Sequence, residues 1–325
     1  MKKILITGAA GYIGSCLFFY LKNNFKVSVI DKKKNVNFSI VNCNLLNFNK
    51  LNKILKKEKP ELIVHFAAQS LVDETINKKK YYQNNIVATN NLIKSMKKNK
   101  INNIIFSSTA ALYKYKNKII SEKSEIKPIS TYAKTKFECE RLIQKSKINS
   151  VILRFFNVCS SLRSKNKIVG ELHNPETHLI PTLVYKNMKK KLVYIYGDNY
   201  KTRDGTCIRD YVHINDICSE VKKSLNYLSK NKNKFEIINI GSSTKITNLE
   251  IIKNVEKLTK IKTKFKLVKR RKGDVAKLSC SINKARNKLN WNPTFSRIPK
   301  IIKDEISWIK HLDKLNIKRK FKNYL

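Results

Sequence analysis

The sequence has little glycine, little acidic charge and no long apolar run. Of its 325 residues, 8 are glycine and 23 are aspartate or glutamate, whereas 69 are lysine or arginine. No uninterrupted apolar stretch approaches the roughly 20 residues that a helix needs to cross a bilayer. We therefore expect no membrane span. A chain of this length can form one large or two modest domains with an ample core.

The cysteines and histidines follow no pattern typical of a metal or disulfide protein. The seven cysteines are dispersed and include no C-x-x-C pair. An odd, scattered set argues against a disulfide framework or a cysteine zinc site and favours a reducing, cytoplasmic location. His65, His173, His178 and His213 show no metal-ligand spacing, so we expect no metal site.

The formal net charge of +46 permits two interpretations. Strong basic charge normally indicates a nucleic-acid partner, and an RNA-binding protein is therefore one hypothesis. The lysines are, however, spread along the whole chain among abundant asparagine and isoleucine. That pattern favours a solvated lysine surface with weak, salt-sensitive adhesion to polyanions, so we expect no specific nucleic-acid binding.

Three of the few glycines fall within seven positions, at Gly8, Gly11 and Gly14. They follow a short β-branched run at residues 4–6 and precede an apolar helical stretch through Leu21. Strand, glycine loop and helix form the context that binds a dinucleotide pyrophosphate at the helix N-terminus. A signal peptide is the alternative, but Gly11 and Gly14 interrupt the apolar core that it would need.

An acidic residue follows this loop at the distance that a dinucleotide site requires. A second strand at residues 27–30 ends at Asp31, which can bind the adenosine ribose hydroxyls about 20 residues beyond the loop. Asp31 should repel a 2′-phosphate and so favour NAD. Residues 32–34 are all lysine, and their positive charge would instead favour the 2′-phosphate of NADP.

Strand and helix signals alternate through the first half of the chain. Further strands are predicted at residues 61–66, 103–106 and 151–156, with helical patterns at 51–55, 82–96 and 131–147. After Asn157 the pattern loosens. It resumes with a helix at 215–228, a strand at 235–240, and a capping box at Thr247 before another helix. A last helix runs through Ile309, and we expect the basic end at residues 318–322 to be frayed.

This alternation predicts an α/β protein with a Rossmann-type, doubly wound parallel sheet and a smaller, mixed α/β lobe. Residues 1–156 would form the NAD-binding domain, with 208–241 returning to it. Residues 157–207 and 242–325 would form a nucleotide-sugar-binding lobe that shares a cleft with it. Gly8, Asp31, Phe66, Thr109 and Phe156 would meet at the carboxyl edge of the sheet, where ligands bind.

Tyr132 and Lys136 lie one helical turn apart on one face of the predicted helix. A phenol is a poor base at neutral pH, but a nearby lysine and an oxidised nicotinamide would lower its pKa. A surface pair on a helix is the alternative. The dinucleotide motif and the strand-end hydroxyls of Ser107, Ser108 and Thr109 favour a general base for a sugar hydroxyl.

Together these residues resemble the UDP-glucose 4-epimerases of the extended short-chain dehydrogenases/reductases, over nearly the full length. The most specific stretch is residues 196–213, YGDNYKTRDGTCIRDYVH, similar to the signature in which an arginine, here Arg209, holds the diphosphate. Residues 7–14, 81–85, 107–113, 176–181 and 271–274 match other family segments. The resemblance implies NAD as cofactor, UDP-glucose and UDP-galactose as substrates, and a homodimer.

The resemblance also implies individual site residues. Tyr132, Lys136 and Thr109 would be catalytic. The implied cofactor contacts are Gly8, Gly11, Tyr12, Ile13, Gly14, Asp31, Asn44, Leu45, Phe66, Ala67, Ala68, Asn84, Ser107, Tyr132, Lys136 and Phe156. The implied substrate contacts are Thr109, Tyr132, Asn157, His178, Leu179, Tyr194, Tyr196, Arg209, Arg271, Asp274 and Leu278.

Several of these residues also have plain structural interpretations. Arg154, which resembles a nucleotide contact, could instead pair within its strand end. His65 fits a hydrogen-bonded core histidine, and His178 could offer only its backbone to the nucleotide. Tyr194 and Tyr196 could be core aromatics.

A few positions depart from the family pattern. Asn44 stands where an aspartate usually contacts adenine, and Ser70 where some relatives carry a lysine. Leu278 occupies the position that gates the sugar's substituents. Ala110 and Ala111 replace the Asp-Glu pair of the 4,6-dehydratases, which argues against a dehydratase. The remaining alternatives on this scaffold are an epimerase for UDP-N-acetylhexosamines and a nucleotide-sugar decarboxylase.

Overall fold

The computed structural model describes residues 3–35, 38–71, 77–115, 118–164, 167–173, 175–271 and 274–317. Its centre is a seven-stranded sheet in which every neighbouring pair is parallel. In spatial order the strands are β13 (Phe235–Ile240), β6 (Asn149–Phe155), β5 (Asn103–Thr109), β4 (Leu62–His65), β1 (Lys3–Thr7), β2 (Lys26–Asp31) and β3 (Val41–Asn42). The predicted fold class is confirmed.

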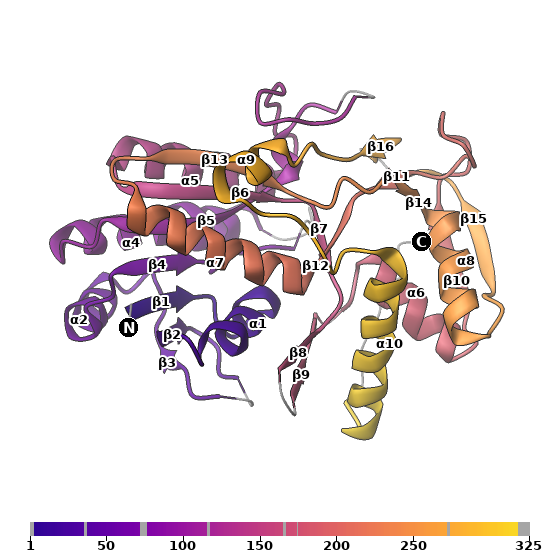
Figure 1. Ribbon diagram of the computed structural model, residues 1–325, viewed down its shortest axis with the longest axis horizontal. Helices are drawn as coiled ribbons and strands as arrows, with labels where there is room; N and C mark the ends of the chain where they lie inside the picture. The colour runs from indigo at the N-terminus through magenta and orange to yellow at the C-terminus, as the bar shows by residue number, and fades with distance from the viewer. Residues whose placement is uncertain are drawn as a thin grey trace.

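Helices cover both faces of the sheet (Figure 1). On one face lie α1 (Tyr12–Leu21), α7 (Ile214–Lys230) and α9 (Asn283–Leu289). On the other lie α2 (Phe48–Glu58), α3 (Lys78–Tyr81), the π-helix η1 (Tyr82–Val87), α4 (Ala88–Lys98) and α5 (Thr131–Ser146). Alternate residues of β1 enter the two cores, with Ile4 and Ile6 on one side and Leu5 on the other, because side chains alternate along a strand.

The chain reverses its direction across the sheet at β1. It runs outward from β1 to β2 and β3, and then returns to β4 on the other side of β1. The loops after β1 and β4 therefore adjoin each other at the carboxyl edge, a topological switch point where such sheets bind ligands. Gly8 and Phe66 begin these two loops.

A second lobe packs beside the carboxyl edge of the sheet (Figure 1). Its core joins three helices, α6 (Leu179–Met188), α8 (Asn248–Thr259) and α10 (Ile298–Lys314). Short strands complete it in pairs or a triplet: β7 (Asn157–Cys159) with β12 (Tyr211–His213), β8 (Leu162–Ser164) with β9 (Lys167–Val169), β10 (Val193–Tyr196) with β15 (Phe265–Val268), and β14 (Ile246–Thr247) with β11 (Ile208–Arg209) and β16 (Lys277–Leu278). The division of the chain into domains stays a prediction.

Several predicted elements need correction. The helix predicted over 82–96 begins as the π-helix η1, and the strand predicted over 103–106 continues through the hydroxyl residues to Thr109. The loose stretch after Asn157 contains strands that the pattern did not indicate. The capping box at Thr247 is present as predicted. Residues 272–273 of the late arginine–aspartate motif, and the basic end at 318–322, lie outside the described residues.

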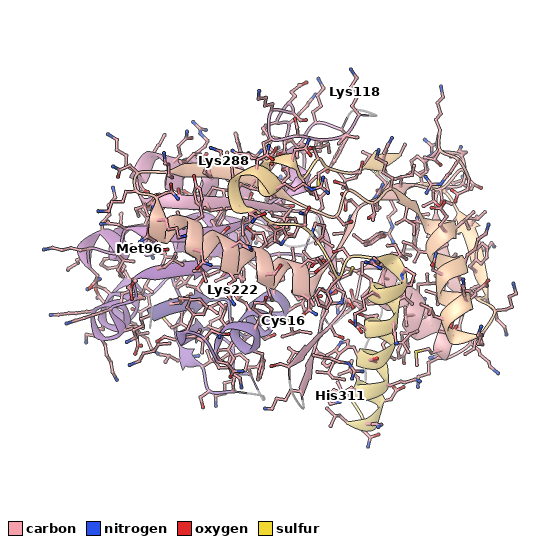
Figure 2. All side chains as sticks on the ribbon, in the orientation of Figure 1. Cys16, Met96, Lys118, Lys222, Lys288 and His311 are labelled. Atoms are coloured by element: carbon pink, nitrogen blue, oxygen red, sulfur yellow. The ribbon has the colours of Figure 1, made fainter. Side chains whose placement is uncertain are left out.

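Basic side chains project around the whole outline of the molecule (Figure 2). The labelled Lys118, Lys222 and Lys288 come from a loop, from α7 and from α9, respectively. None of the described helices is both long and apolar enough to cross a bilayer.

Candidate active site

The three glycines of the loop differ in how closely neighbouring atoms approach them. Gly8 has a φ of +74°, and a Cβ there would lie 2.4 Å from the backbone nitrogen of Ala67. A Cβ at Gly14 would lie 2.3 Å from the carbonyl oxygen of Gly8. A Cβ at Gly11 would approach only the Gly8 oxygen, at 3.3 Å. The fold thus requires Gly8 and Gly14, whereas Gly11 leaves the N-terminus of α1 exposed, where amides attract an anion.

Asp31 borders this loop from the end of β2. Its Oδ2 accepts a hydrogen bond from the Ala10 amide at 3.0 Å, and its Oδ1 accepts one from the Lys33 amide at 2.9 Å. The Lys32 ammonium reaches across to Oδ1 of Asn84 at 2.8 Å. Lys32, which follows Asp31 in the chain, thus connects the end of β2 to Asn84, another predicted cofactor contact.

The other predicted cofactor residues differ in exposure. Asn44 is exposed and its Oδ1 accepts from the Leu46 amide at 3.1 Å, while Leu45 is buried. Ile13 packs against the core beside α1. The Tyr12 hydroxyl donates to the Ser160 carbonyl at 2.6 Å and so ties the glycine loop to the second lobe.

The loops that follow β4, β5 and β6 complete the carboxyl edge. The Ala67 amide donates to Oγ1 of Thr7 at 3.3 Å, with Phe66 and Ala68 on either side. The Ser107 hydroxyl donates to the His65 carbonyl at 3.2 Å, and Phe156 is buried at the end of β6. The structure thus places the predicted cofactor residues around one edge of the sheet.

His65 is a core histidine, as its plain interpretation predicted. It is 1% exposed, and its two ring nitrogens lie 2.7 Å from Oγ1 of Thr7 and 3.0 Å from Oγ1 of Thr89. Burial, and secondarily the Lys136 charge, lowers the pKa of His65 to about 3. The ring is therefore neutral at physiological pH.

Tyr132 and Lys136 lie on α5, whose start is capped by the Ser130 hydroxyl accepting from the Ala133 amide at 3.2 Å. Tyr132 is half-buried, whereas Lys136 is 2% exposed with its ammonium 4.1 Å from the centre of the Phe106 ring. Burial lowers the pKa of Lys136 to about 8. The ammonium thus sits in a desolvated position beside an aromatic face.

Burial raises the pKa of Tyr132 to about 12, and a hydrogen bond with Thr109 acts in the opposite direction. The sequence analysis had assigned the lowering of this pKa to Lys136 and an oxidised nicotinamide. In the protein alone the counteracting group is the Thr109 hydroxyl, which also accepts from the Ala111 amide at 3.2 Å. The phenol needs further positive charge before it can act as a base near neutral pH.

A buried network beneath this edge was missed by the sequence analysis. Arg154 donates to both carboxylate oxygens of Glu140, at 3.0 and 2.7 Å, and to the Tyr113 hydroxyl at 2.9 Å. The Ser108 hydroxyl donates to the same carboxylate at 2.5 Å, and the Tyr113 hydroxyl donates to Asn239 at 2.6 Å. Arg154 is therefore a structural partner of Glu140 and not a nucleotide contact, which corrects the functional interpretation.

A cavity of about 220 Å³ opens in the second lobe. Predicted substrate contacts line it: Asn157, His178, Leu179, Tyr194, Tyr196, Arg209, Arg271 and Asp274. Thr109 and Tyr132 are not among the described lining residues. Thr109 pairs with Phe155 across β5 and β6, however, and Asn157 of the lining follows Phe155 by two residues. The cavity therefore adjoins the carboxyl edge of the sheet.

Two arginines and Lys186 bring positive charge to the cavity. Arg209 donates to Asp274 at 2.5 Å and to the Val275 carbonyl at 2.8 Å, which fixes its guanidinium. The Arg271 guanidinium lies 4.0 Å from the centre of the Tyr196 ring. Planar, oriented guanidinium groups bind phosphate well.

The cavity also contains residues that the sequence analysis did not single out. Asn248, Tyr211 and Lys186 line it, and each comes from a different element. Leu278 does not belong to the described lining, but it pairs with Arg209 in the β11–β16 register. Tyr211 lies within the 196–213 stretch, but no local motif marks Asn248 or Lys186, because only the tertiary fold brings them to the cavity.

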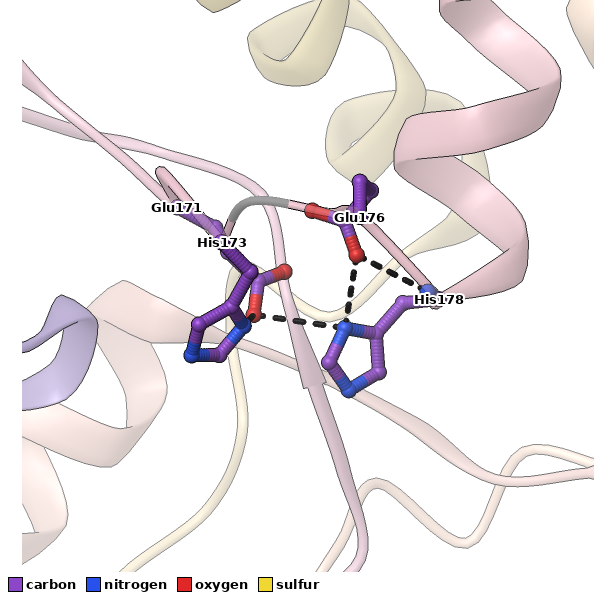
Figure 3. A group of neighbouring side chains, drawn as sticks. All are labelled: Glu171, His173, Glu176 and His178. Carbon is purple, nitrogen blue, oxygen red and sulfur yellow. Dashed lines mark hydrogen bonds and ion pairs between the residues drawn. The ribbon is translucent and has the colours of Figure 1, made fainter. Parts of the chain in front are cut away.

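The structure brings together two histidines for which the spacing predicted no metal site. His173 and His178 cluster with Glu171 and Glu176 next to the cavity (Figure 3). One ligand atom from each of the four residues lies within 4.8 Å of the others. The short stretch 171–178 thus holds a possible ligand set that the sequence interpretation overlooked.

Comparisons with known proteins agree with this architecture. A profile of the NAD-dependent epimerase/dehydratase family matches residues 4–241, from β1 to the end of β13. The chain belongs to this family. Membership in the epimerase/dehydratase family confirms the resemblance seen in the sequence.

Individual relatives in this family cover nearly the whole chain. The UDP-glucose 4-epimerase of Streptococcus mutans is 36% identical over 323 residues, covering 94% of this chain and 96% of the relative. The Brucella ovis UDP-glucose 4-epimerase, solved in complex with NAD, is 28% identical with a TM-score of 0.88, covering 95% and 98%. The UDP-Glc/GlcNAc 4-epimerase of Campylobacter jejuni is 32% identical with a TM-score of 0.81, covering 96% and 100%.

Proposed function

We propose that the protein is an NAD-dependent UDP-glucose 4-epimerase that interconverts UDP-galactose and UDP-glucose through a 4-keto sugar. The observation that carries the proposal is the arginine-lined cavity adjoining the sheet edge that holds Tyr132, Lys136 and Thr109. The similarity to UDP-glucose 4-epimerases over nearly the full chain supports the same reaction.

The residues around the glycine loop fit NAD. Gly11 leaves room for a pyrophosphate at the N-terminus of α1, and Asp31 stands beside the loop where it can accept from the adenosine ribose. Asp31 would disfavour a 2′-phosphate, and flexible lysines at 32–34 are easily screened. When bound, NAD supplies a reversible hydride acceptor for carbon 4 of the sugar.

The catalytic residues would divide the proton chemistry among them. Tyr132 would remove the proton from the hydroxyl on carbon 4 and return it after the keto sugar has turned over. Thr109 lowers the pKa of Tyr132, and its hydroxyl would orient or relay that proton. Lys136 would stabilise the phenolate and bind the nicotinamide ribose, and its burial strengthens the effect of its charge.

The cavity would bind the nucleoside diphosphate. Arg209 and Arg271 would hold the phosphates, and Asp274 would hold both Arg209 and the uridine ribose. Tyr194, Tyr196, His178 and Leu179 would form the walls. The binding energy would come from charge-assisted hydrogen bonds to the diphosphate, leaving the sugar free to rotate.

One second function has a specific observation in its favour. The C. jejuni relative is named for both UDP-Glc and UDP-GlcNAc, so turnover of N-acetylated sugars is the alternative. Leu278 is intermediate in size and offers no hydrogen bond to an amide, which favours the plain sugars. A 4,6-dehydratase is disfavoured because Ala110 and Ala111 offer no acid or base.

We further propose a cytoplasmic homodimer that acts in galactose metabolism. Dimerisation rests on the family resemblance. A reducing compartment is supported by the seven cysteines, which are all buried and free.

The test is to incubate the purified protein with UDP-galactose without added cofactor and to look for UDP-glucose. We expect conversion, because each cycle regenerates the cofactor, and NAD should be released on denaturation. Absence of conversion even with added NAD would overturn the proposed reaction. Release of mainly NADP would overturn the role given to Asp31.

A further inference from the structure

Two glutamates and two histidines form a cluster on the segment that leads into α6 (Figure 3). Glu171 and Glu176 are 3% and 0% exposed, whereas His173 is partly buried and His178 faces solvent and the cavity. The proposed epimerase reaction has no use for the two buried carboxylates. They therefore need an explanation of their own.

The distances within the cluster resemble those of a tetrahedral ligand set. Oε1 of Glu171 lies 2.6 Å from Nδ1 of His173 and 3.3 Å from Nδ1 of His178. Oε1 of Glu176 lies 2.9 Å from the same His178 nitrogen. A tetrahedral zinc ion with bonds of 2.0–2.1 Å separates its ligand atoms by about 3.3 Å. The 3.3 Å pair matches that separation, whereas the 2.6 and 2.9 Å pairs would widen around an ion.

Hydrogen bonding leaves two atoms of the cluster unused. Within the described part of the chain, neither Nδ1 of His173 nor Oε2 of Glu171 has a hydrogen-bond partner. The His173 nitrogen is thus close to a carboxylate oxygen without hydrogen-bond geometry. Because Glu171 is almost fully buried, its unpartnered oxygen points to a ligand.

The surrounding backbone holds the ligand atoms in place. Oε1 of Glu176 accepts from the amides of Thr177 and His178, both at 2.8 Å. The Trp308 indole of α10 donates to the Glu171 carbonyl at 2.9 Å. Supporting hydrogen bonds of this kind orient metal ligands in known sites.

The charge of the cluster also favours a cation. Both carboxylates face imidazoles, which carry charge only when protonated. Glu171 is 3% exposed and one of its oxygens has no hydrogen-bond partner, and an uncompensated buried carboxylate is strongly unfavourable. A divalent cation would neutralise both carboxylates and leave the imidazoles neutral, the form that binds metal.

We propose that Glu171, His173, Glu176 and His178 form a structural binding site for a zinc-class divalent cation. Four nitrogen and oxygen ligands suit Zn²⁺ and its substitute Co²⁺. The ion joins residues 171–173 to residues 175–178, which precede α6, and so positions His178 and Leu179 in the cavity wall. The site stands independently of the epimerase reaction.

The test uses the full-length, tag-free protein, stripped with EDTA and then titrated with Zn²⁺. We expect about one zinc per chain by elemental analysis after desalting, a higher melting temperature with zinc than with EDTA, and the visible spectrum of tetrahedral Co²⁺ after exchange. Binding to thiols should not interfere, because all seven cysteines are buried.

Two variants and a control sharpen this test. His173→Gln and Glu171→Gln should each weaken zinc binding by at least the ~10–100-fold that loss of an outer-shell partner costs. His311→Gln on α10 removes an imidazole outside the cluster and should bind zinc like the parent. His173 is partly exposed, so its variant should fold even if Glu171→Gln does not.

Two outcomes would overturn the proposal. One is a folded parent protein that binds no zinc and whose melting temperature changes with pH but not with zinc. The cluster would then be neutralised by protons and not by a metal ion. The other is a folded His173→Gln variant that binds zinc as tightly as the parent. Enzymatic activity is not a readout, so failure of the epimerase proposal would leave this test intact.

Discussion

The carboxyl edge of the sheet and the cavity beside it hold their functional side chains in different ways. At the edge, Tyr132 and Lys136 share one helix, and burial of both groups dominates their electrostatics. In the cavity, Arg209 and Asp274 come from segments 65 residues apart and are held by an ion pair that solvent still reaches. Desolvation can shift the pKa values of catalytic groups, whereas oriented charges bind a ligand. Substitutions at the sheet edge should therefore mainly change turnover, and substitutions in the cavity should mainly change binding.

The largest effect should come from the edge. Tyr132→Phe keeps the ring but removes the ionisable oxygen, so turnover should fall by about 10²–10⁴-fold, the usual contribution of a general base. UDP affinity should stay near that of the parent, measured by calorimetry on the same preparation. The control is Tyr227→Phe, at a half-buried tyrosine of α7 whose hydroxyl donates to Glu236, and it should change neither. Turnover within a few-fold of the parent would remove Tyr132 from its assigned role.

A change in the cavity should produce the opposite pattern. Arg209→Gln removes a charged donor and leaves Asp274 without its ion-pair partner, so UDP affinity should fall by about 1.5–3 kcal/mol, the range for hydrogen bonds to charged groups. The matched control is Arg203→Gln, whose exposed ion pair with Glu250 lies elsewhere. Equal UDP affinity in the parent and Arg209→Gln would contradict the assignment of the cavity.

Lys136 should destabilise the folded state, although it is proposed to stabilise the phenolate of Tyr132. Its folded-state pKa of about 8 is below the about 10.4 of an unfolded lysine, so folding disfavours the ammonium. The unfolded chain then binds more protons between these two values. The penalty is therefore complete below pH 8 and disappears as the pH rises toward about 10.4.

Lys136→Met should accordingly stabilise the protein by roughly 1–3 kcal/mol at neutral pH, while turnover falls and its pH profile moves upward. Denaturant unfolding at several pH values measures the first effect, and initial rates measure the second. Lys134→Met, exposed on the same helix, is the control. A variant less stable than the parent at pH 7 would show that contacts of the lysine outweigh its desolvation.

The smallest effect concerns Leu278, which links the two regions by pairing beside Arg209. If Leu278 gates the sugar, UDP-glucose and UDP-galactose should be better substrates than the N-acetylated pair. Leu278→Ser should then reduce this preference for the plain sugars by about 1–3 kcal/mol. Specificity constants for both pairs measure it. Lost stability with an unchanged substrate ratio would show that Leu278 only packs in the second lobe.

The same contrast explains how far the sequence could predict the structure. The glycine loop and the Tyr132–Lys136 pair are local patterns, so spacing alone located them. The cavity joins short strands such as β10 and β15, which pair Tyr196 with Val268 and are too brief to show periodicity. Those residues could be anticipated only through family resemblance. Helical spacing also could not distinguish the π-helix η1 from an α-helix, since the two differ by one residue in hydrogen-bond register.

The Glu171–His178 cluster and the Arg154–Glu140 network show a second limit. Histidine spacing failed because two of the four clustered residues are glutamates. Arg154 resembled a ligand contact because the local sequence of a strand-end arginine does not show whether it binds a nucleotide or pairs with a buried carboxylate. Only the position of Glu140, 14 residues away on α5, decides between the two.

The most direct test of the proposed reaction follows the hydrogen on carbon 4 of the sugar. UDP-galactose carrying deuterium at carbon 4 is converted by the purified protein, and the UDP-glucose formed is analysed by mass spectrometry and NMR. We predict that the deuterium remains on carbon 4, because the hydrogen leaves and returns as hydride within a closed cleft. Replacement of the deuterium by solvent hydrogen would contradict the account, since it would mean that a base removes a proton from carbon 4 itself.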